Sequence, residues 1–186
     1  RISNPRLCAE VLLSHFLDVD RSYLYAHDDR ILTEAEYDAL ENAVYDRING
    51  VPVQYIVGHQ EFYGRDFIVN PSVLIPRPET EYIVDSALEL KPETHAKIID
   101  VGTGSGCIAV TLALEVPQAA GFAPDISDDG LQGAKQNAAT LGASVPFACM
   151  DLLDAVSDTF DFVVSNPPYV RRGDFDRLQR EVREHE

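Results

Sequence analysis

The sequence predicts an α/β protein in which a domain built on a parallel β-sheet follows a small helical bundle and a β-hairpin linker. Three observations predict this order. Apolar residues recur at helical spacing over roughly the first fifty residues, a short aromatic stretch with a glycine follows, and strands alternate with helices after Lys97. We expect the helical domain to span residues 1–60, the hairpin linker residues 61–74 and the sheet domain residues 75–186.

The first part of the chain has the pattern of a helical bundle. Thr33 is followed three residues later by Glu36, which fits a capping box at the start of a helix. The apolar face of that helix continues to Ile48, and Gly50 with Pro52 just beyond then ends it. A bundle of this size is too small to be an independent catalytic unit.

The next part has the pattern of a hairpin that joins the two domains. The aromatic pair Phe62-Tyr63 precedes Gly64, and a second apolar run begins at Phe67. A proline-rich stretch, residues 75–81, then leads into a helix. The carboxylates of this stretch lie in the first turn of that helix, where they interact favourably with the positive end of the helix dipole. We therefore interpret them as helix caps in preference to an acid/base pair.

After Lys97 short apolar runs alternate with helical patterns, which predicts a parallel sheet with helices on both faces. The expected strands cover residues 98–101, 119–124, 145–149 and 160–165. The expected helices between them cover residues 107–115 and 128–141. Because the carboxyl ends of parallel strands meet at one edge of the sheet, the residues that follow each strand are the first candidates for a binding site.

Composition excludes several classes of partner. The chain of 186 residues has 15 basic and 31 acidic residues, a formal net charge of −16, which disfavours nucleic acid as the main partner. Cys8, Cys107 and Cys149 are widely spaced and indicate buried free thiols in preference to a disulfide framework or a zinc site. No apolar run approaches the roughly 20 residues that span a bilayer.

The loop after the first sheet strand, residues 100–106, reads Asp-Val-Gly-Thr-Gly-Ser-Gly. Glycines allow the backbone to turn sharply and to approach a ligand closely, and a helix N-terminus then directs free N–H groups at it. The G-x-G-x-G spacing and the absence of a following Gly-Lys-Ser/Thr exclude a P-loop. A glycine-rich turn without a ligand is the alternative.

Acidic residues at the next two strand ends argue for a nucleoside ligand. Asp125 ends the second strand, where a carboxylate can accept from both ribose hydroxyls. We expect Asp151 to end the third strand with Leu152 beside it. This pair suits an adenine, since the carboxylate accepts from the exocyclic amine and the apolar side chain covers the ring.

The fourth strand is followed by Asn166-Pro167-Pro168-Tyr169. The two prolines fix φ and stiffen the loop. The Asn166 side-chain oxygen and the Pro167 carbonyl can together accept both hydrogens of a planar NH2 group, while the Tyr169 ring covers its flat face. The alternative is a purely structural Asn-Pro turn.

Assembled in this order, the features resemble class I S-adenosylmethionine-dependent methyltransferases, which have a Rossmann-like fold. More narrowly, the chain resembles the PrmC/HemK family of protein-(glutamine-N5) methyltransferases, over nearly its whole length. The family-specific blocks are Phe62–Gly64 and Pro76–Glu81, and the final Glu181–Glu186 also matches. Because a complete fold of this class has seven strands, the resemblance implies that the methyltransferase domain is incomplete at its C-terminus here.

The resemblance also implies roles for individual residues. Asn166, Pro167 and Tyr169 are the implied catalytic residues. The implied cofactor-binding residues are Pro76, Thr80, Asp100, Gly102, Thr103, Gly104, Ser105, Gly106, Asp125, Asp151, Leu152 and Asn166. The implied substrate-binding residues are Phe62, Arg77, Asn166, Pro167, Pro168 and Tyr169. No metal is implied.

The implied reaction transfers a methyl group from S-adenosyl-L-methionine to the side-chain amide nitrogen (N5) of a glutamine in peptide-chain release factors and leaves S-adenosyl-L-homocysteine. The helical domain would recognise this protein substrate, in the cytoplasm and without binding DNA or a membrane. Two alternatives remain: an adenine-N6 DNA methyltransferase, disfavoured by the acidic charge and the Pro76–Glu81 block, and a non-catalytic module that binds a cofactor or a protein.

Overall fold

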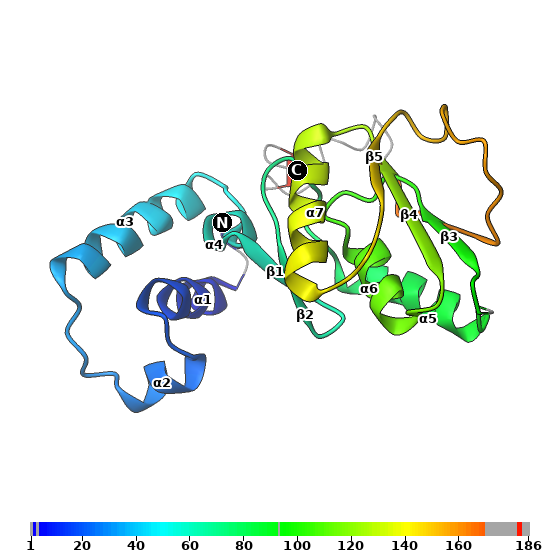
Figure 1. Ribbon diagram of the computed structural model, residues 1–186. Helices are drawn as coiled ribbons and strands as arrows, with labels where there is room; N and C mark the ends of the chain where they lie inside the picture. The colour runs from blue at the N-terminus through cyan, green and yellow to red at the C-terminus, as the bar shows by residue number, and fades with distance from the viewer. Residues whose placement is uncertain (1, 3, 93, 170–181, 184–186) are drawn as a thin grey trace. The chain divides into compact units, whose positions relative to one another are not determined.

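The computed structural model describes residues 2, 4–92, 94–169 and 182–183, and these fall into two compact units that meet in sequence between Gly58 and His59 (Figure 1). The block Glu181–Glu186, apart from Val182 and Arg183, lies outside the described residues. No helix among the described residues is long and apolar enough to cross a membrane.

The first unit is helical. Its helices are α1 (Pro5–Leu17), α2 (Arg21–Ala26), α3 (Glu34–Ile48) and α4 (Val53–Val57). Its buried core consists of Leu12, Leu40, Ala43 and Val57. The capping box is confirmed, because the Thr33 hydroxyl accepts from the Glu36 N–H at 3.3 Å and the Glu36 carboxylate accepts from the Thr33 N–H at 2.8 Å.

A hairpin opens the second unit. Strands β1 (His59–Phe62) and β2 (Arg65–Ile68) pair antiparallel around a two-residue turn, Tyr63-Gly64, in which both residues have positive φ. Phe62 and Phe67 are 1% and 0% exposed and belong to the hydrophobic core of this unit. The hairpin therefore packs as part of the second unit, and its strands cover residues 59–68.

Among the described residues, the parallel sheet of the second unit has four strands. They are β3 (Lys97–Asp100), β4 (Ala120–Asp125), β5 (Phe147–Cys149) and β6 (Phe162–Val164). Their spatial order is β5-β4-β3-β6, so the chain moves outward from β3 to β5 and then returns to the other side of β3. The point at which the order reverses lies between β3 and β6, and in open α/β sheets ligands bind outside the carboxyl ends of strands at such a point.

Helices α5 (Glu81–Glu89), α6 (Cys107–Glu115) and α7 (Asp128–Leu141) all lie on one side of the sheet among the described residues (Figure 1) and pack in a row, α5 on α6 and α6 on α7. The reason is topological. The crossovers β3-α6-β4 and β4-α7-β5 run in the same direction, and the preferred right-handed crossover then puts both helices on one face. The return from β5 to β6 contains no helix. The expectation of helices on both faces stays a prediction, because residues 170–181, which follow β6, lie outside the described residues.

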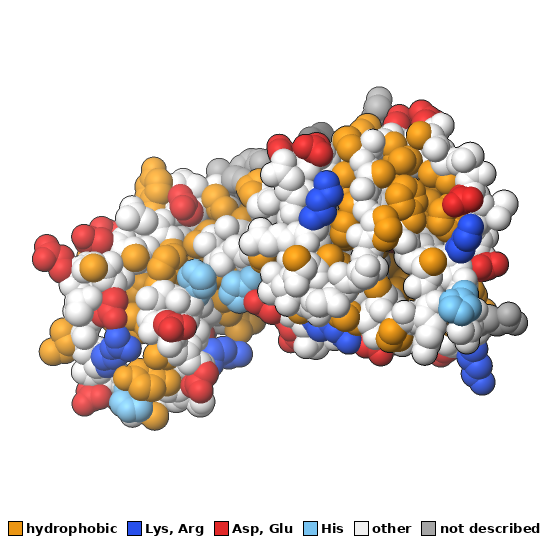
Figure 2. All heavy atoms as spheres, viewed as in Figure 1, with side chains coloured by type: hydrophobic (Ala, Val, Ile, Leu, Met, Phe, Trp, Pro, Cys, Tyr) orange, Lys and Arg blue, Asp and Glu red, His pale blue; other side chains and the backbone are white. Residues whose placement is uncertain are grey.

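A shallow apolar groove of about 350 Å³ borders β3, β4 and the segment before β6. Figure 2 shows the hydrophobic side chains gathered over this part of the sheet. The groove is lined by Lys97, Ala120, Gly121, Phe122, Pro146, Ala155, Val156, Ser157, Asp158 and Phe160. The rings of Phe122 and Phe160 stack there with their centroids 6.3 Å apart.

Candidate functional site

The glycine loop lies over the end of β4. The N–H groups of Gly102 and Thr103 both donate to the Pro124 carbonyl, at 3.0 and 3.2 Å. Proline is unusual in an interior strand because it lacks an N–H donor. Here β4 nevertheless continues to Asp125, and the Pro124 carbonyl becomes the anchor of the loop. The proline therefore does not loosen the end of the strand.

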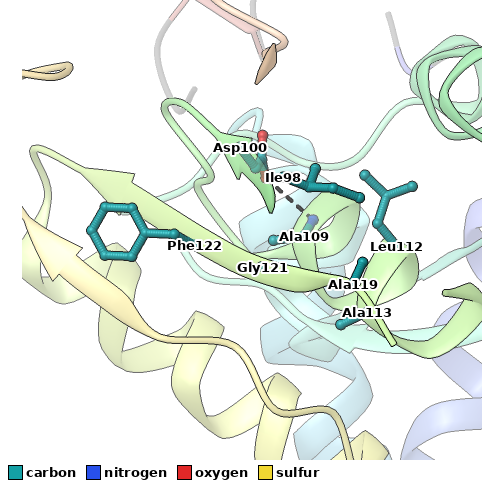
Figure 3. A pocket seen from close by; sticks show the side chains of 8 residues that line it. All are labelled: Ile98, Asp100, Ala109, Leu112, Ala113, Ala119, Gly121 and Phe122. Atoms are coloured by element: carbon teal, nitrogen blue, oxygen red, sulfur yellow. Dashed lines mark hydrogen bonds between the residues drawn. The ribbon is translucent and has the colours of Figure 1, made fainter. Parts of the chain in front are cut away.

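Asp100 is a buried carboxyl group under the same loop. Its Oδ2 atom accepts from the Thr103 hydroxyl at 2.6 Å and from the Ala109 N–H at 3.2 Å, and Figure 3 shows the bond to Ala109. Its Oδ1 atom is buried and has no hydrogen-bond partner among the described residues. Burial is the main effect, and it raises the pKa of Asp100 to about 6. The two hydrogen bonds lower this pKa, and the nearby charge of Asp125 raises it slightly.

Asp125 at the end of β4 is held by two backbone donors. Oδ2 accepts from the Gly104 N–H at 2.8 Å, and Oδ1 accepts from the Ser127 N–H at 2.9 Å. Each carboxylate oxygen has a second lone-pair site. The aspartate thus ties the glycine loop to the start of α7 and still has two acceptor sites in fixed positions.

The loop after β6 is joined to the glycine loop. The Val101 N–H donates to the Val164 carbonyl at 2.9 Å, and the Ser165 hydroxyl donates to the Val101 carbonyl at 2.7 Å. The next residue, Asn166, donates from Nδ2 to the Thr80 hydroxyl oxygen at 3.1 Å. The structure therefore brings together the ends of β3, β4 and β6 and the segment before α5.

The predicted adenine-binding pair is placed differently from the expectation. Strand β5 ends at Cys149, so Asp151 lies in the turn beyond it and does not end the strand. Asp151 is exposed, and Leu152 is 66% exposed with a φ of +49°. Within the described part of the chain, neither side chain makes a hydrogen bond or an ion pair with the glycine loop, and their role as adenine ligands stays a prediction.

The other predicted substrate and cofactor residues divide by burial. Phe62 is a core residue edge-on to Phe67, with ring centroids 6.0 Å apart, and its implied role as a substrate residue stays a prediction. Pro76 and Thr80 are buried, Arg77 is half-buried, and Pro167 and Pro168 are exposed. Tyr169 is 80% exposed.

No disulfide joins the cysteines of the described residues, and these cysteines do not share one environment. Cys107 is buried, and burial raises the pKa of its thiol to about 12, which makes it a poor nucleophile. Cys149 is exposed, contrary to the expectation of buried thiols. Within residues 2, 4–92, 94–169 and 182–183, no group of three His, Cys, Asp or Glu side chains could hold a metal ion.

Two polar residues that the sequence did not single out position this site. Asn137 on α7 is 1% exposed and donates from Nδ2 to the Ser105 carbonyl at 2.9 Å, inside the glycine loop. Ser165 makes the bond to Val101 described above. Only the unusual placement of a polar residue on the buried face of a helix could have indicated Asn137.

Comparison with known proteins gives the family. The family model of the PrmC N-terminal domain matches residues 1–58 of this chain, and the family model of the Methyltransferase small domain matches residues 83–182. The fold also resembles the crystal structure of the Pyrococcus abyssi tRNA (uracil-54, C5)-methyltransferase in complex with S-adenosyl-L-homocysteine. That likeness covers 67% of this chain and 32% of the other, with a TM-score of 0.50 and 20% identity, and shows the fold alone.

Curated relatives named release factor glutamine methyltransferase match nearly the whole chain. The protein of Koribacter versatilis is 52% identical over 98% of this chain and 66% of its own length. The protein of Chlorobaculum tepidum is 46% identical over 100% of this chain and 68% of its own length. The chain thus spans about two thirds of the length of the curated relatives it matches. It belongs to the release factor glutamine methyltransferase family.

Proposed function

We propose that the protein transfers a methyl group from S-adenosyl-L-methionine to the side-chain amide nitrogen of a glutamine in a peptide-chain release factor. The observation that carries the proposal is the junction of two loops, where the Ser165 hydroxyl bonds the Val101 carbonyl at 2.7 Å. It puts Asn166 next to the glycine loop at the reversal point of the sheet. The names of the relatives support the choice of substrate.

The residues around the glycine loop fit this cofactor. Gly102 has a φ of +72°, and a Cβ added there would meet no atom within 4 Å, so a ligand can lie against the backbone. The remaining acceptor sites of Asp125 suit the two ribose hydroxyls. The unpartnered Oδ1 of Asp100 suits the cationic amino group of the methionine part, directly or through a water.

The proposed chemistry depends mainly on position. When bound, the cofactor supplies an electrophilic methyl group on a sulfonium sulfur. The amide nitrogen of glutamine is a weak nucleophile because its lone pair is delocalised into the carbonyl. Asn166 and the Pro167 carbonyl hold the NH2 group through its two hydrogens and direct the nitrogen at the methyl carbon. Such positioning contributes roughly 7–11 kcal/mol to lowering a barrier.

The remaining steps need no strong base in the site. In the proposed transfer the nitrogen–carbon bond would form as the carbon–sulfur bond breaks, the electron pair of that bond would stay on sulfur, and the methylated amide would then release a proton. We assign no histidine to this step. A histidine of the hairpin, His59, has its Nδ1 atom 2.8 Å from a carboxylate oxygen of Asp66. Tyr169 would cover the amide and exclude water, which strengthens the hydrogen bonds that hold it.

We assign recognition of the release factor to the helical unit. It has its own buried core and matches a family model of its own. Helix α3 buries Leu40 and Ala43 in that core and leaves Tyr37, Tyr45 and Ile48 more than half exposed. Because release factors act on ribosomes, the reaction would take place in the cytoplasm.

The test is methyl transfer from radiolabelled S-adenosyl-L-methionine by the full-length protein, with a release factor or duplex DNA as acceptor. We expect label on the release factor, located to a glutamine by mass spectrometry of its peptides. Label on DNA alone would support the adenine-N6 alternative and refute the proposal. Cofactor binding without transfer to either acceptor would indicate a non-catalytic module.

Two substitutions separate the two halves of the site. Asn166→Ala should abolish transfer and leave the dissociation constant of the cofactor within about twofold, because it removes only an acceptor for the amide. Asp125→Ala should weaken cofactor binding at least about tenfold. Equal loss of cofactor affinity in both variants would mean that Asn166 serves the cofactor or the fold.

A further inference from the structure

The Thr80 hydroxyl does not make the hydrogen bond that is usual for a threonine at the N-terminus of a helix. Thr80 is the N-cap residue of α5, where a threonine side chain normally accepts from a backbone N–H of the first turn. It makes no such bond, its φ and ψ are helical at −68° and −22°, and its side chain is 6% exposed. Its hydroxyl oxygen instead accepts from Nδ2 of Asn166, a residue 86 positions later.

The same bond constrains Asn166. In the part of the chain that the structure describes, it is the one hydrogen bond of the Asn166 side chain. The backbone of the loop is fixed separately, since the preceding Ser165 bonds Val101. Rotation of the Asn166 side chain away from Thr80 would break this bond, and no other side-chain hydrogen bond among the described residues holds the Asn166 amide.

We infer that Thr80 is a positioning residue that orients the Asn166 amide for the reaction. With Nδ2 bound to Thr80, the acceptor Oδ1 is the atom left for a substrate NH2 group, which has two hydrogens to donate and no strong acceptor. In the reverse orientation Asn166 would present its own NH2 group to that of the substrate, and no hydrogen bond could form. The Thr80 hydroxyl holds the Asn166 side chain in place, and in the observed orientation it accepts from Nδ2 and leaves Oδ1 free to accept from the substrate.

This inference rests on the proposed function and revises one part of it. The resemblance implied that Thr80 binds the cofactor, whereas its hydroxyl is engaged with Asn166. Loss of the hydroxyl should therefore slow transfer and leave cofactor affinity unchanged. The hydroxyl, and not the shape of the side chain, should carry the effect.

The first experiment measures kcat, KM and cofactor affinity in the full-length protein. Thr80→Val keeps the size of the side chain and removes the hydroxyl, Thr80→Ser restores the hydroxyl, and Thr111→Val is the matched control. Thr111 is fully buried, and its hydroxyl has no partner among the described residues. Removing the Thr111 hydroxyl should therefore not affect transfer.

We expect Thr80→Val to lower kcat about tenfold or more, with a cofactor dissociation constant within about twofold of the wild type, whereas Thr80→Ser stays within about threefold. A parallel loss of cofactor affinity in Thr80→Val would overturn the inference, because Thr80 would then be a cofactor or folding residue. Wild-type kcat in Thr80→Val would overturn it as well.

A second experiment does not depend on the substrate. In protein labelled with 15N-asparagine, the side-chain NH2 signals of Asn166 are assigned by their loss in Asn166→Asp. Thr80→Val should shift these signals and speed their exchange with water, whereas Thr80→Ser and Thr111→Val should not. Unchanged Asn166 signals in Thr80→Val would refute the inference even if the release factor proved not to be the substrate.

Discussion

Asn137 and Ile68 are joined by two reciprocal hydrogen bonds, the Ile68 N–H donating to Oδ1 of Asn137 at 2.8 Å and Nδ2 of Asn137 donating to the Ile68 carbonyl at 3.0 Å. The side-chain amide thus continues the hydrogen bonding of strand β2 onto helix α7. Its Nδ2 also donates to the Ser105 carbonyl at 2.9 Å. One buried side chain thereby connects the hairpin, helix α7 and the glycine loop.

Replacing Asn137 should destabilise the second unit and disturb its site. Asn137→Ala leaves the polar backbone groups of Ile68 and Ser105 without their partner, at a cost of about 1–3 kcal/mol for each group that stays buried and unpaired. We expect a loss of about 2–4 kcal/mol in the free energy of unfolding, measured by urea denaturation.

The neighbouring Gln136→Ala is the control for that substitution, since Gln136 is exposed on the same helix. It should change the free energy of unfolding by less than about 0.5 kcal/mol. If Asn137→Ala proved as mild as Gln136→Ala, the three bonds would not contribute measurably to stability.

Asp125→Asn should weaken cofactor binding without unfolding the protein. One oxygen of the carboxylate becomes an NH2 group, which cannot accept both from the backbone and from a ribose hydroxyl. Loss of one or two such bonds corresponds to an affinity about 10–100-fold lower, measured by calorimetric titration of S-adenosyl-L-methionine. Asp129→Asn, which removes one charge at an exposed position nearby on α7, should change the affinity less than about twofold. Comparable losses in both variants would mean that only net charge matters.

The sequence was sufficient for the elements that depend on local patterns. Strands and helices of the sheet domain lie within a few residues of the predicted ranges. Apolar periodicity, and the glycines and prolines that mark the ends of elements, are signals contained in short stretches of sequence. The glycine loop, Asp125 and Asn166 were predicted as site residues because they follow strands whose carboxyl ends share one edge.

The contacts that orient these residues could not be predicted in the same way. Asn137 bonds a strand 69 positions earlier, and Thr80 bonds Asn166 across 86 positions. A hydrogen bond between distant segments leaves no periodic pattern in one sequence. The burial of Phe62 against Phe67 and the core of the unit likewise depends on contacts between distant segments, and its implied role as a substrate residue stays a prediction.

The buried carboxyl of Asp100 should make stability depend on pH. Its pKa is raised from 3.8 to about 6, mainly by burial, so folding favours its neutral form. Its contribution is fully present below pH 3.8 and is lost as the pH rises through about 6. At about 1.36 kcal/mol per pH unit, a rise of about two units corresponds to a loss of roughly 3 kcal/mol.

Asp100→Asn removes this titration and isolates its effect. The stability of the cofactor-free variant relative to the wild type should increase between pH 4 and pH 6.5 by about 2–3 kcal/mol, measured by urea denaturation at each pH. The same variant should bind the cationic cofactor less tightly at neutral pH, because the negative charge is gone. A stability difference that does not vary with pH would show that Asp100 is ionised in the folded protein throughout this range.

Gly106 at the start of α6 combines a positive φ of +79° with a close neighbour. A Cβ added there would lie 3.1 Å from the Cβ and 3.4 Å from the Cα of Ala134 on α7. Gly142, at the end of α7, has a similar φ of +76°, but a Cβ added there would meet no atom within 4 Å. The two glycines therefore share the backbone strain of an alanine substitution and differ in the contact.

Gly142→Ala should lower the free energy of unfolding by about 1–2 kcal/mol through backbone strain alone. Gly106→Ala should lower it by about 1–3 kcal/mol more, because the added methyl group forces α6 and α7 apart. The shift would also move the N-terminal N–H groups of α6, so cofactor affinity should fall in Gly106→Ala and not in Gly142→Ala. Equal destabilisation by the two substitutions would mean that α6 and α7 move apart without a cost in free energy. Gly106 would then be required for its backbone conformation and not for the close packing of α6 on α7.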